Sequence, residues 1–533
     1  INEGNIETDY TIYLDDIELE EGETRMPDSA LRYSLTRNDE TNDPDNISNM
    51  GVNPNRVVDS GSIAVDETIN YTLKIWIDYD ATTEEASGKT FKGKLRVVAT
   101  QPTGEKVSDV VLDNVGDNGD TYDDGYDTFI TGTDPNNYVW YSGKLWRAVS
   151  VNNEAKTTKL VTQWNISAIT YSSGSTDFAG SYMEEWLNDT TVDGFLGNLR
   201  EPENFIVMNS KWNATETTSS SKPPETTIVE DAVGLLNYYE YVTSYKGATY
   251  SNGYLNNGLY WWCLTPYDST KVWRIDNNGH FGYNWSTIYS YGIRPSINLK
   301  SDLKIVDGNG TESNPYRLEG DNDTISSGTK LSSRYSGEYV QFGNDENNLY
   351  RIVSHENGTG TKITSEEPLK ENNNFKTTSF GDNINYSDTN TIGTFLNKDY
   401  LTTYVGESYS NMIEDNTIWY LGEVNSGISY KLAKYIDKFG TALTTNTTSA
   451  KVGLLRLGEL MSGQFGKAEN NSDYWTLTPD SISTIRFINN NGYANNDPQD
   501  STFAIKPSLN LKQNVVITSG DGTKENPFTL SVQ

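Results

Sequence analysis

The stretch YGIRPSINLK (residues 291–300) returns almost unchanged as FAIKPSLNLK (residues 503–512). The two stretches begin 212 residues apart, which is the length of a domain and far longer than the unit of a solenoid repeat. Shorter matches flank them in the same order, at offsets that drift as loops of different length would cause. The matched segments are LWRAVS (145–150) with LYRIVS (349–354), WLN (186–188) with FLN (395–397), VGLLNYYEYV (233–242) with VGLLRLGELM (452–461), WWCLTP (261–266) with YWTLTP (474–479), RIDNNGH (274–280) with FINNNGY (487–493), and GNGTESNPYRL (308–318) with GDGTKENPFTL (520–530). We therefore expect a duplicated domain.

The length of 533 residues allows about three domains, each with a core of its own. Residues 1–112 have no counterpart elsewhere in the chain, and we expect them to form one domain. The sequence DNVGDNGDTYDDGYD (113–127) is rich in Asp, Asn and Gly, which is typical of a linker or loop. The two copies then occupy residues 128–320 and 321–533.

Composition limits the setting in which this chain works. Its aromatic content of 12% is typical of a folded protein, and its net charge of −33 argues against nucleic acids and anionic membranes as partners. No apolar run reaches the roughly 18–20 residues needed to cross a bilayer, so we expect no membrane insertion. Because the chain begins at Ile1 rather than Met, we favour an exported protein whose signal has been removed over a shortened chain. We expect it to be secreted or held at the cell surface.

Two segments of the first domain alternate between apolar and polar residues. In NYTLKIWIDYD (70–80) the residues Tyr71, Leu73, Ile75 and Ile77 share one face. TFKGKLRVVA (90–99) repeats the pattern after a short turn, and its inward residues are expected to be Phe91, Leu95 and Val97. This alternation predicts half-buried antiparallel strands and therefore a β-sandwich.

The segment GSIAVDETINYTLKIWIDYDATTEEASGKTFKGKLRVVA (61–99) resembles the C-terminal half of the camelysin/TasA family of exported matrix-fibre proteins of Gram-positive bacteria. The resemblance implies a jelly-roll sandwich. It also implies a subunit of a pilus-like or biofilm-matrix filament, in which an N-terminal segment completes the sheet of the next copy. Backbone pairing at an open sheet edge would make such a joint strong.

The donor segment that this resemblance implies is INEGNIETDYTIYLDDIEL (1–19). Its joint residues would be Tyr10, Ile12 and Leu14, which alternate with Thr11 and Tyr13 and so predict a strand with one apolar face. The chain's partners would then be copies of itself in a head-to-tail homopolymer. The alternative is an ordinary first strand that pairs within its own domain.

Each copy of the duplicated domain is expected to be α+β. It opens with a strand and continues with a short helix (SYMEEWLND or TIGTFLNKD), a second helical stretch (230–242 or 451–461) and several short strands. The order of W-x-L-T-P, N-N-G and R/K-P-S-x-N-L resembles C-type-lectin-like modules borne in tandem by Gram-positive surface proteins. In the closing phrase, Arg294 and its counterpart Lys506 are open to a functional role, but an ion pair or a solvated side chain is the simpler interpretation.

The lectin-like resemblance places the ligand surface in the loops before the closing strand. The candidate residues are His280, Tyr283, Trp285 and Tyr289 in the first copy, and Tyr493, Asn495, Asn496, Asp497 and Gln499 in the second. Aromatic rings beside amides and carboxylates suit sugar rings, and equally suit a protein interface. The alternative is that about half of these aromatic residues belong to the core.

Few residues are available for catalysis, and we expect no enzyme. The chain has two histidines, His280 and His355, and one cysteine, Cys263, which we expect to be buried and apolar in role. No zinc-protease, nucleophile-elbow, phosphate-loop or dinucleotide motif is present. A glycosidase stays open, because any two of the 74 acidic residues could face each other.

We expect no cofactor other than calcium. The acidic stretch offers Asp113, Asp117 and Asp120, whose hard oxygen ligands suit calcium, although their spacing departs from that of an EF-hand. Taken together, the sequence predicts an extracellular structural protein, a fibre subunit that displays two lectin-like modules for adhesion. The alternative is a monomeric adhesin that binds glycans or a host-surface protein.

Overall fold

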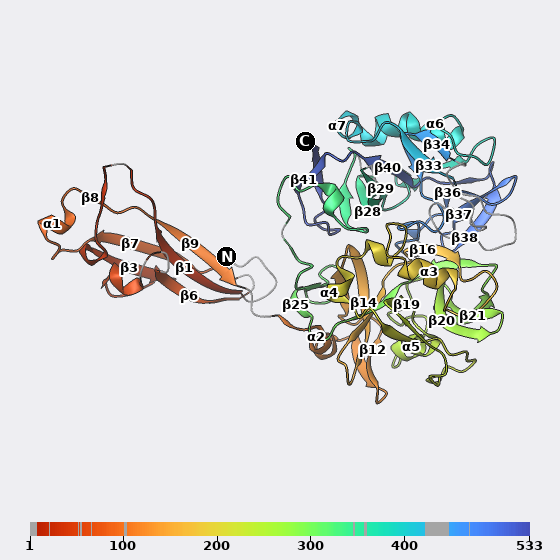
Figure 1. The fold of residues 1–533 in the computed structure, drawn as a ribbon, viewed down its shortest axis with the longest axis horizontal. Coiled ribbons are helices and arrows are strands. Elements are labelled where there is room, and N and C mark those ends of the chain that lie inside the picture. Colours follow the sequence, from red (N-terminus) through yellow and green to blue (C-terminus); the bar gives the residue numbers. More distant parts are fainter. Residues whose placement is uncertain are drawn as a thin grey trace. The chain divides into compact units, whose positions relative to one another are not determined.

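The computed structural model describes residues 8–533, except residues 21, 52, 54–55, 65–66, 101–103, 324, 345–346, 356–359, 422–446 and 468–469. The fold is β-rich, with 40% of residues in strands and 13% in helices, as predicted at this level. The chain divides into two compact units (Figure 1). Unit 1 comprises residues 1–105 with 306–309, and unit 2 comprises residues 106–305 with 310–533. The two copies, predicted as separate domains, therefore belong to one compact unit.

Unit 1 contains two small sheets. The first has the order β6-β1-β9 with β1 in the centre, and in the second β3 pairs with β7 on one side and with β4 and β5 on the other. The strands are β1 (Thr8–Asp16), β3 (Leu31–Arg37), β4 (Glu40–Thr41), β5 (Asp45–Asn46), β6 (Val57–Ile63), β7 (Tyr71–Ile77) and β9 (Gly93–Thr100). A short parallel pair, β2 (Thr24–Arg25) and β8 (Lys89–Thr90), and a one-turn helix, α1 (Thr83–Ala86), complete it.

The core of unit 1 is small and centres on β1. The alternation predicted for β1 is confirmed, because its side chains Tyr10, Ile12 and Leu14 are all buried. The buried cluster that contains Leu14 draws its other members from the second sheet and the loops, namely Met26, Ala30, Leu31, Ile47 and Met50. Burial of β1 thus joins the two sheets.

The predicted burial of β9 is wrong at two positions. Leu95 and Val97 are 53% and 63% exposed. They lie opposite Leu14 and Ile12 in the ladder and so share their face of the sheet. The core ends at β1, however, and leaves this face of the edge strand uncovered.

In unit 2 the duplication is confirmed by strand order. The first copy contains the sequence of paired strands β13-β14-β15-β24-β19, and the second contains β27-β28-β29-β40-β35 in the same arrangement. The bounds are β13 (Tyr138–Tyr141), β14 (Lys144–Asn152), β15 (Thr158–Thr162), β24 (Ser296–Leu299), β19 (Val233–Gly234), β27 (Tyr339–Gln341), β28 (Leu349–His355), β29 (Thr361–Ser365), β40 (Pro507–Leu511) and β35 (Val452–Leu454). The repeated sequence therefore encodes a repeated sheet.

The repeated phrase YGIRPSINLK forms two strands rather than one. β23 (Ser290–Ile293) ends before Pro295, and β24 begins directly after it in a different sheet. Proline lacks the N–H group that an inner strand must donate, so it fits at such a crossing. In the second copy β39 (Thr502–Ala504) and β40 divide in the same way. The phrase occurs twice because each copy uses it to link its two sheets.

The cation in this phrase is structural. The guanidinium of Arg294 is buried and donates to the carbonyl oxygens of Thr162 and Leu255 at 2.8 and 2.7 Å. Lys506 is also buried, and its ammonium donates to the carbonyl oxygen of Met461 at 3.3 Å. Burial lowers the pKa of Arg294 to about 9 and that of Lys506 to about 8. Both side chains are therefore held by carbonyls, and the prediction of a solvated side chain or ion pair is wrong.

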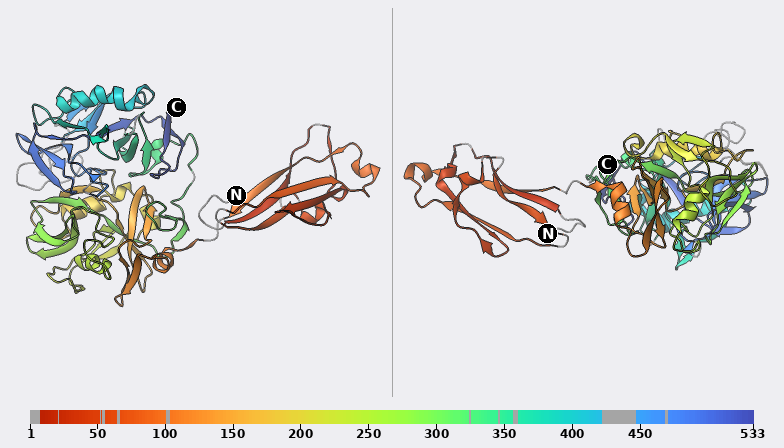
Figure 2. Two further views of the ribbon diagram at one scale, coloured as in Figure 1. Left: turned by 180° about the vertical axis from the view of Figure 1, so that it is seen from behind. Right: turned by 90° about the horizontal axis from the view of Figure 1, so that it is seen from below.

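A second sheet joins the two copies. Its strands follow the order β22-β21-β20-β23-β38-β37-β36-β39-β32, and β16 also pairs with β23. The two halves meet where Ser290 of β23 lies opposite Ala494 of β38. The bounds are β16 (Ser167–Thr170), β20 (Trp261–Asp268), β21 (Lys271–Ile275), β22 (Phe281–Trp285), β32 (Thr377–Ser379), β36 (Tyr474–Pro479), β37 (Thr484–Ile488) and β38 (Ala494–Pro498). The first copy, coloured orange to green, and the second, coloured green to blue, lie side by side both in Figure 1 and in the view from behind in Figure 2.

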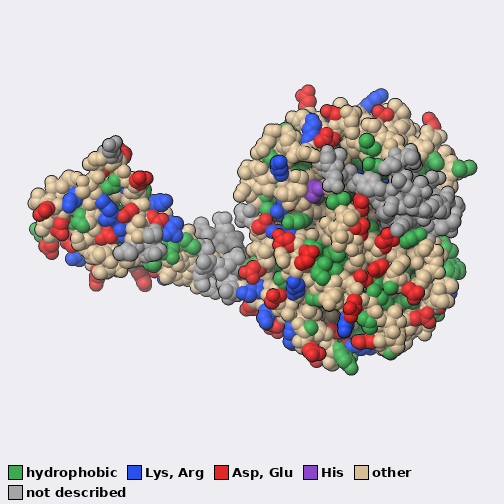
Figure 3. Space-filling view, in the orientation of Figure 1, with side chains coloured by type: hydrophobic (Ala, Val, Ile, Leu, Met, Phe, Trp, Pro, Cys, Tyr) green, Lys and Arg blue, Asp and Glu red, His purple; other side chains and the backbone are tan. Residues whose placement is uncertain are grey.

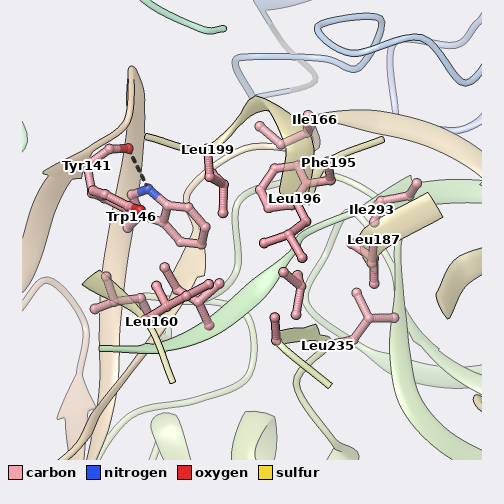
Figure 4. Close-up of a cluster of buried hydrophobic side chains, with 14 of the residues drawn as sticks. Tyr141, Trp146, Leu160, Ile166, Leu187, Phe195, Leu196, Leu199, Leu235 and Ile293 are labelled. Carbon is pink, nitrogen blue, oxygen red and sulfur yellow. Dashed lines mark hydrogen bonds between the residues drawn. The ribbon is translucent and has the colours of Figure 1, made fainter. Parts of the chain in front are cut away.

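Buried contacts also hold the copies together. The side-chain amide of Asn165 donates to the carbonyl oxygen of Gly492 at 3.2 Å, and the backbone N–H of Gly463 donates to that of Ile166 at the same distance. Figure 4 shows the main buried cluster of the first copy, in which Trp146 Nε1 donates to the carbonyl oxygen of Tyr141 at 3.0 Å. Its members from the second copy are Val353, Leu455, Leu460 and Met461. The main core of the first copy is thus completed by side chains of the second.

The predicted helices are only partly present. The first short helix exists in both copies, as α3 (Tyr182–Asn188) and α6 (Thr391–Asn397). The second, α5 (Tyr238–Ser244), occurs in the first copy only. Residues 452–461 form β35 and turns instead, because Val452 to Leu454 pair with the closing strand β40.

The acidic stretch 113–127 belongs to unit 2 instead of separating domains. Asp113 ends the helix α2 (Val107–Asp113), and β11 (Gly119–Asp123) pairs with β12 (Asp127–Gly132). Acidic side chains are scattered over the visible face of both units (Figure 3), as a net charge of −33 requires. Among the described residues, no helix is long and apolar enough to cross a membrane.

The remaining strands are short. They are β10 (Glu105–Lys106), β17 (Ser210–Asn213), β18 (Ile228–Asp231), β25 (Lys304–Asp307), β26 (Tyr316–Leu318), β30 (Lys370–Glu371), β31 (Asn374–Phe375), β33 (Thr417–Tyr420), β34 (Thr447–Ala450), β41 (Val515–Ser519) and β42 (Thr529–Val532). There are also two one-turn helices, α4 (Pro202–Phe205) and α7 (Glu407–Ser410).

Candidate functional site

Three aromatic side chains project from β22, the strand at one end of the joint sheet. Phe281, Tyr283 and Trp285 are 42%, 44% and 46% exposed. Because successive residues of a strand point to opposite faces, these alternate residues lie on one face. We call them the aromatic strip. Exposed rings in a row are uncommon on a protein surface and mark it as a candidate binding face.

The aromatic strip rests on fixed rings. Trp273 of β21 lies opposite Tyr283, is buried, and stacks on Tyr238 with centroids 4.2 Å apart. The ring of Tyr267 stacks on Tyr283 at 3.7 Å. Trp273 Nε1 also donates to the carbonyl oxygen of Thr217 at 2.8 Å. The strip is therefore preorganised, since binding need not order these side chains.

A charged pair borders the strip. The ammonium of Lys271 lies 5.5 and 5.9 Å from the ring centres of Tyr283 and Trp285, within cation–π range. It also pairs with Asp268 at 3.2 Å. Hydrogen bonds from the hydroxyl and backbone of Thr270 help to lower the pKa of Asp268 to about 2, so this carboxylate is ionised at neutral pH. The strip thus combines apolar faces with fixed polar groups.

The other two residues predicted in the first copy lie beside the strip. His280 precedes it in a turn where its N–H donates to Asp276, and its ring lies 4.1 Å from that of Tyr250. Tyr289 is 37% exposed and stacks on the buried Tyr291 at 5.6 Å. The structure therefore places Tyr283 and Trp285 on the strand β22 rather than in the predicted loop, and gives His280 a turn position.

The predicted residues of the second copy are not gathered in this way. Ala494, Asn496 and Pro498 take the positions of the strip, and β38 is an inner strand of the joint sheet. Tyr493 packs against Tyr260 of the first copy at 5.3 Å. Asn496 is exposed and donates to Asp480 at 2.7 Å. Asn495 is exposed too, whereas Asp497 and Gln499 are half-buried.

The other predicted site residues lie elsewhere. Tyr10, Ile12 and Leu14 pair within their own unit, and residues 1–7 of the predicted donor segment lie outside the described residues. Asp113 and Asp120 lie on α2 and β11, with Asp117 between them. The described part of the chain contains no group of three or more His, Cys, Asp or Glu side chains placed to hold a metal ion. The calcium site stays a prediction.

Comparison with known proteins gives one match. Residues 156–301 match the family model of a domain of unknown function, DUF6273. This range runs from just before β15 to just after β24 and contains the aromatic strip. No curated protein matches the chain, and no solved structure does. The resemblances to camelysin/TasA and to C-type-lectin-like modules therefore stay predictions.

Three members of this surface were not predicted from the sequence, namely Phe281, Tyr267 and Lys271. The signal for Phe281 was present, because aromatic residues alternate in FGYNW (281–285). The signal for the other two residues was absent, because they reach the strip only through the pairing of neighbouring strands.

Proposed function

We propose that this chain is a non-enzymatic, extracellular structural protein, a subunit of a bacterial surface fibre of the pilus-like or biofilm-matrix kind. In this proposal unit 1, as a jelly-roll-like sandwich, joins copies head to tail by exchanging β1, and the lectin-like copies of unit 2 serve adhesion. The observation that carries it is the position of β1, the first described strand, in the centre of its sheet. A strand that pairs on both sides can be exchanged between subunits, because the same backbone pairs then form with the next copy.

The contacts of β1 determine when exchange can occur. Burial of side chains such as Tyr10, Ile12 and Leu14 is worth about 1.5–3 kcal/mol each, so withdrawing β1 would forfeit about 5–9 kcal/mol. Asp16 adds an ion pair of 2.6 Å with the buried guanidinium of Arg56. This sum approaches the whole stability of a small domain. We therefore expect exchange between chains that are still folding, because the same contacts then form between subunits.

Paired cysteines test this exchange. Thr11 and Val98 lie opposite each other on β1 and β9, and Thr36 and Thr72 do so on β3 and β7. In a Cys263→Ala background, a Thr11→Cys/Val98→Cys variant refolded at high concentration should give a ladder of disulfide-linked multimers on a non-reducing gel. The control pair Thr36→Cys/Thr72→Cys should give monomers, because those strands stay within one chain.

A monomer band for both cysteine pairs would contradict the proposal of a fibre joined by β1. Negative-stain electron microscopy of the same samples should then show single particles rather than filaments. A ladder from the first pair alone, together with filaments, would establish β1 as the joint between subunits.

A monomeric surface adhesin for glycans or a host-surface protein is the second candidate, and the aromatic strip favours it. A Tyr283→Ala/Trp285→Ala variant should lose binding on a glycan array and to immobilised host-matrix proteins. Its free energy of unfolding should change little, since these rings are nearly half exposed. Ile482→Ala is the matched control, because Ile482 is 96% exposed and lies outside the strip. Loss of folding in the double variant would assign the rings to the core.

A further inference from the structure

A cleft of about 500 Å³ opens in the first copy, and none of the residues of the aromatic strip lines it. It lies between the tip of the hairpin β14–β15, the hairpin β17–β18 and the first turn of α5. This volume is within the usual range of small-ligand sites. The chemistry of the lining decides what such a cleft can hold.

The floor of the cleft is an ion pair over a tryptophan. The ammonium of Lys159 donates to Glu240 and lies 5.1 Å from the ring of Trp212. Glu240 is fixed by α5, since its second carboxylate oxygen accepts the backbone N–H of Asn237 at 2.8 Å. Among the described residues Lys159 has no other acceptor, so two of its N–H groups are left for a ligand. Asn298 lies opposite Lys159 on β24.

The same floor exists in the second copy. Lys362 pairs with Glu459 at 2.7 Å and lies 5.2 Å from the ring of Trp419, and Asn510 lies opposite it. Asn510 is 1% exposed, whereas Asn298 is only half-buried. Residues 422–446, which join β33 to β34, lie outside the described residues. The floor is thus a structural feature of both copies.

Two side-chain amides of the cleft are free. Asn209 is exposed, Asn298 is half-buried, and neither side chain makes a hydrogen bond within the described residues. A free amide offers two donors and an acceptor. Beside them stands an aromatic wall, in which Tyr126 is 67% exposed and Tyr239 is held by a hydrogen bond of 3.0 Å to Asp124.

The charges around the cleft balance. Three lysines and three acidic residues line it, in a chain whose net charge is −33. These six residues are Lys159, Lys211, Lys222, Asp127, Glu225 and Glu240. A phosphate or carboxylate ligand would meet as many carboxylates as ammonium groups. The lining therefore suits a neutral ligand with many hydroxyl groups and at least one apolar face.

We infer that this cleft is a binding site for a short neutral saccharide, held by Asn209, Asn298 and Lys159 and flanked by Tyr126. The amides and the ammonium donate to ring hydroxyls, and the exposed tyrosine ring packs against the C–H face of a sugar. This site is separate from the aromatic strip and from the exchange of β1, so it does not depend on the proposed function.

Saturation-transfer NMR of the full chain tests the inference with defined probes. The neutral probes are cellobiose, maltose, lactose and the dimer of N-acetylglucosamine, and the charged probe is glucose 6-phosphate. At least one neutral disaccharide should bind, and an Asn209→Ala/Asn298→Ala variant should weaken it about tenfold or more. Tyr126→Ala should weaken disaccharide binding as well. This second variant keeps the inference testable if the double variant fails to fold.

The controls separate this site from others. Asn385→Ala, at an exposed asparagine of the second copy, and Tyr283→Ala/Trp285→Ala in the strip should leave the affinity unchanged. The inference is overturned if no neutral disaccharide binds or if only glucose 6-phosphate binds. It is also overturned if binding is lost in the Tyr283→Ala/Trp285→Ala variant and kept in the variants of the cleft. In the last case the adhesin candidate would still stand.

Discussion

Replacement of Gly463 by alanine tests whether the two copies of unit 2 are held at one fixed separation. Gly463 belongs to the second copy, and an added Cβ would lie 1.8 Å from the carbonyl oxygen of Asn165 in the first. It would lie 2.6 Å from the carbonyl carbon of the same residue. Real Cβ atoms do not come within 3.0 Å of such neighbours. Because the obstructing atoms are backbone, a rotamer change cannot relieve the clash, and the copies must move apart.

The expected loss of stability follows from this geometry. Overpacking of a rigid contact costs about 1–3 kcal/mol, and separation also weakens the hydrogen bond from Gly463 to Ile166, worth about 0.5–1.5 kcal/mol. The free energy of unfolding of unit 2 should therefore fall by about 2–4 kcal/mol. Gly174→Ala is the matched control, because no atom lies within 4 Å of its added Cβ and its φ is not positive. That variant should be neutral or gain about 0.4–1 kcal/mol.

Denaturant unfolding of the full chain, followed by tryptophan fluorescence, measures the difference. Trp76 is the one tryptophan of residues 1–105, so the signal reports mainly on unit 2. If Gly463→Ala and Gly174→Ala unfold within about 0.5 kcal/mol of each other, the close approach of the copies is refuted. If Gly463→Ala unfolds in two steps, the copies are stable alone and joined only by this interface.

Three further measurements address individual side chains. Burial, with a contribution from Glu184, raises the pKa of Asp231 to about 6 from 3.8, so the ionised form disfavours the folded state. Thermal stability should therefore fall as pH rises from about 4 to about 6, and Asp231→Asn should remove that slope. Arg294→Ala should destabilise unit 2 by about 3 kcal/mol or more, because two buried carbonyls lose their donor. Arg294→Lys should cost less, since Lys506 fills the matching position, and equal losses in urea unfolding would contradict this reasoning. Burial raises the pKa of the Cys263 thiol, so iodoacetamide should label Cys263 only in denaturant, as mass spectrometry can show.

The sequence predicts the structure best where a local pattern specifies it. The matched segments of the two copies predicted the duplication, and strand order confirms it. The alternation of apolar residues in β1 predicted burial of Tyr10, Ile12 and Leu14, as observed. The same rule was wrong for Leu95 and Val97, because burial of one face requires a second sheet opposite it, and the sequence does not specify how far that sheet extends.

Part of the candidate cleft also left a signal that sequence analysis did not use. The two copies share Glu240 and Glu459 in the segments that begin VGLL, and Asn298 and Asn510 in the closing phrase. Polar residues kept within matched apolar blocks point to a common buried feature. The free amide of Asn209 and the wall at Tyr126 could not be found in this way, because they meet only in the folded chain.

The sequence by itself determined the number of copies and the side chains of β1 that alternate into the core. These follow from local periodicity and from repetition, which act within a few residues or are visible on comparison. Only the tertiary structure decided that the closing phrase crosses between two sheets and that β38 pairs with β23 across the copies. It also decided that the side chain of Lys159 is more exposed than that of Lys362, at 16% against 7%. Such features depend on pairing between residues some 200 positions apart, where backbone hydrogen bonds and packing select among edges that the sequence leaves equivalent.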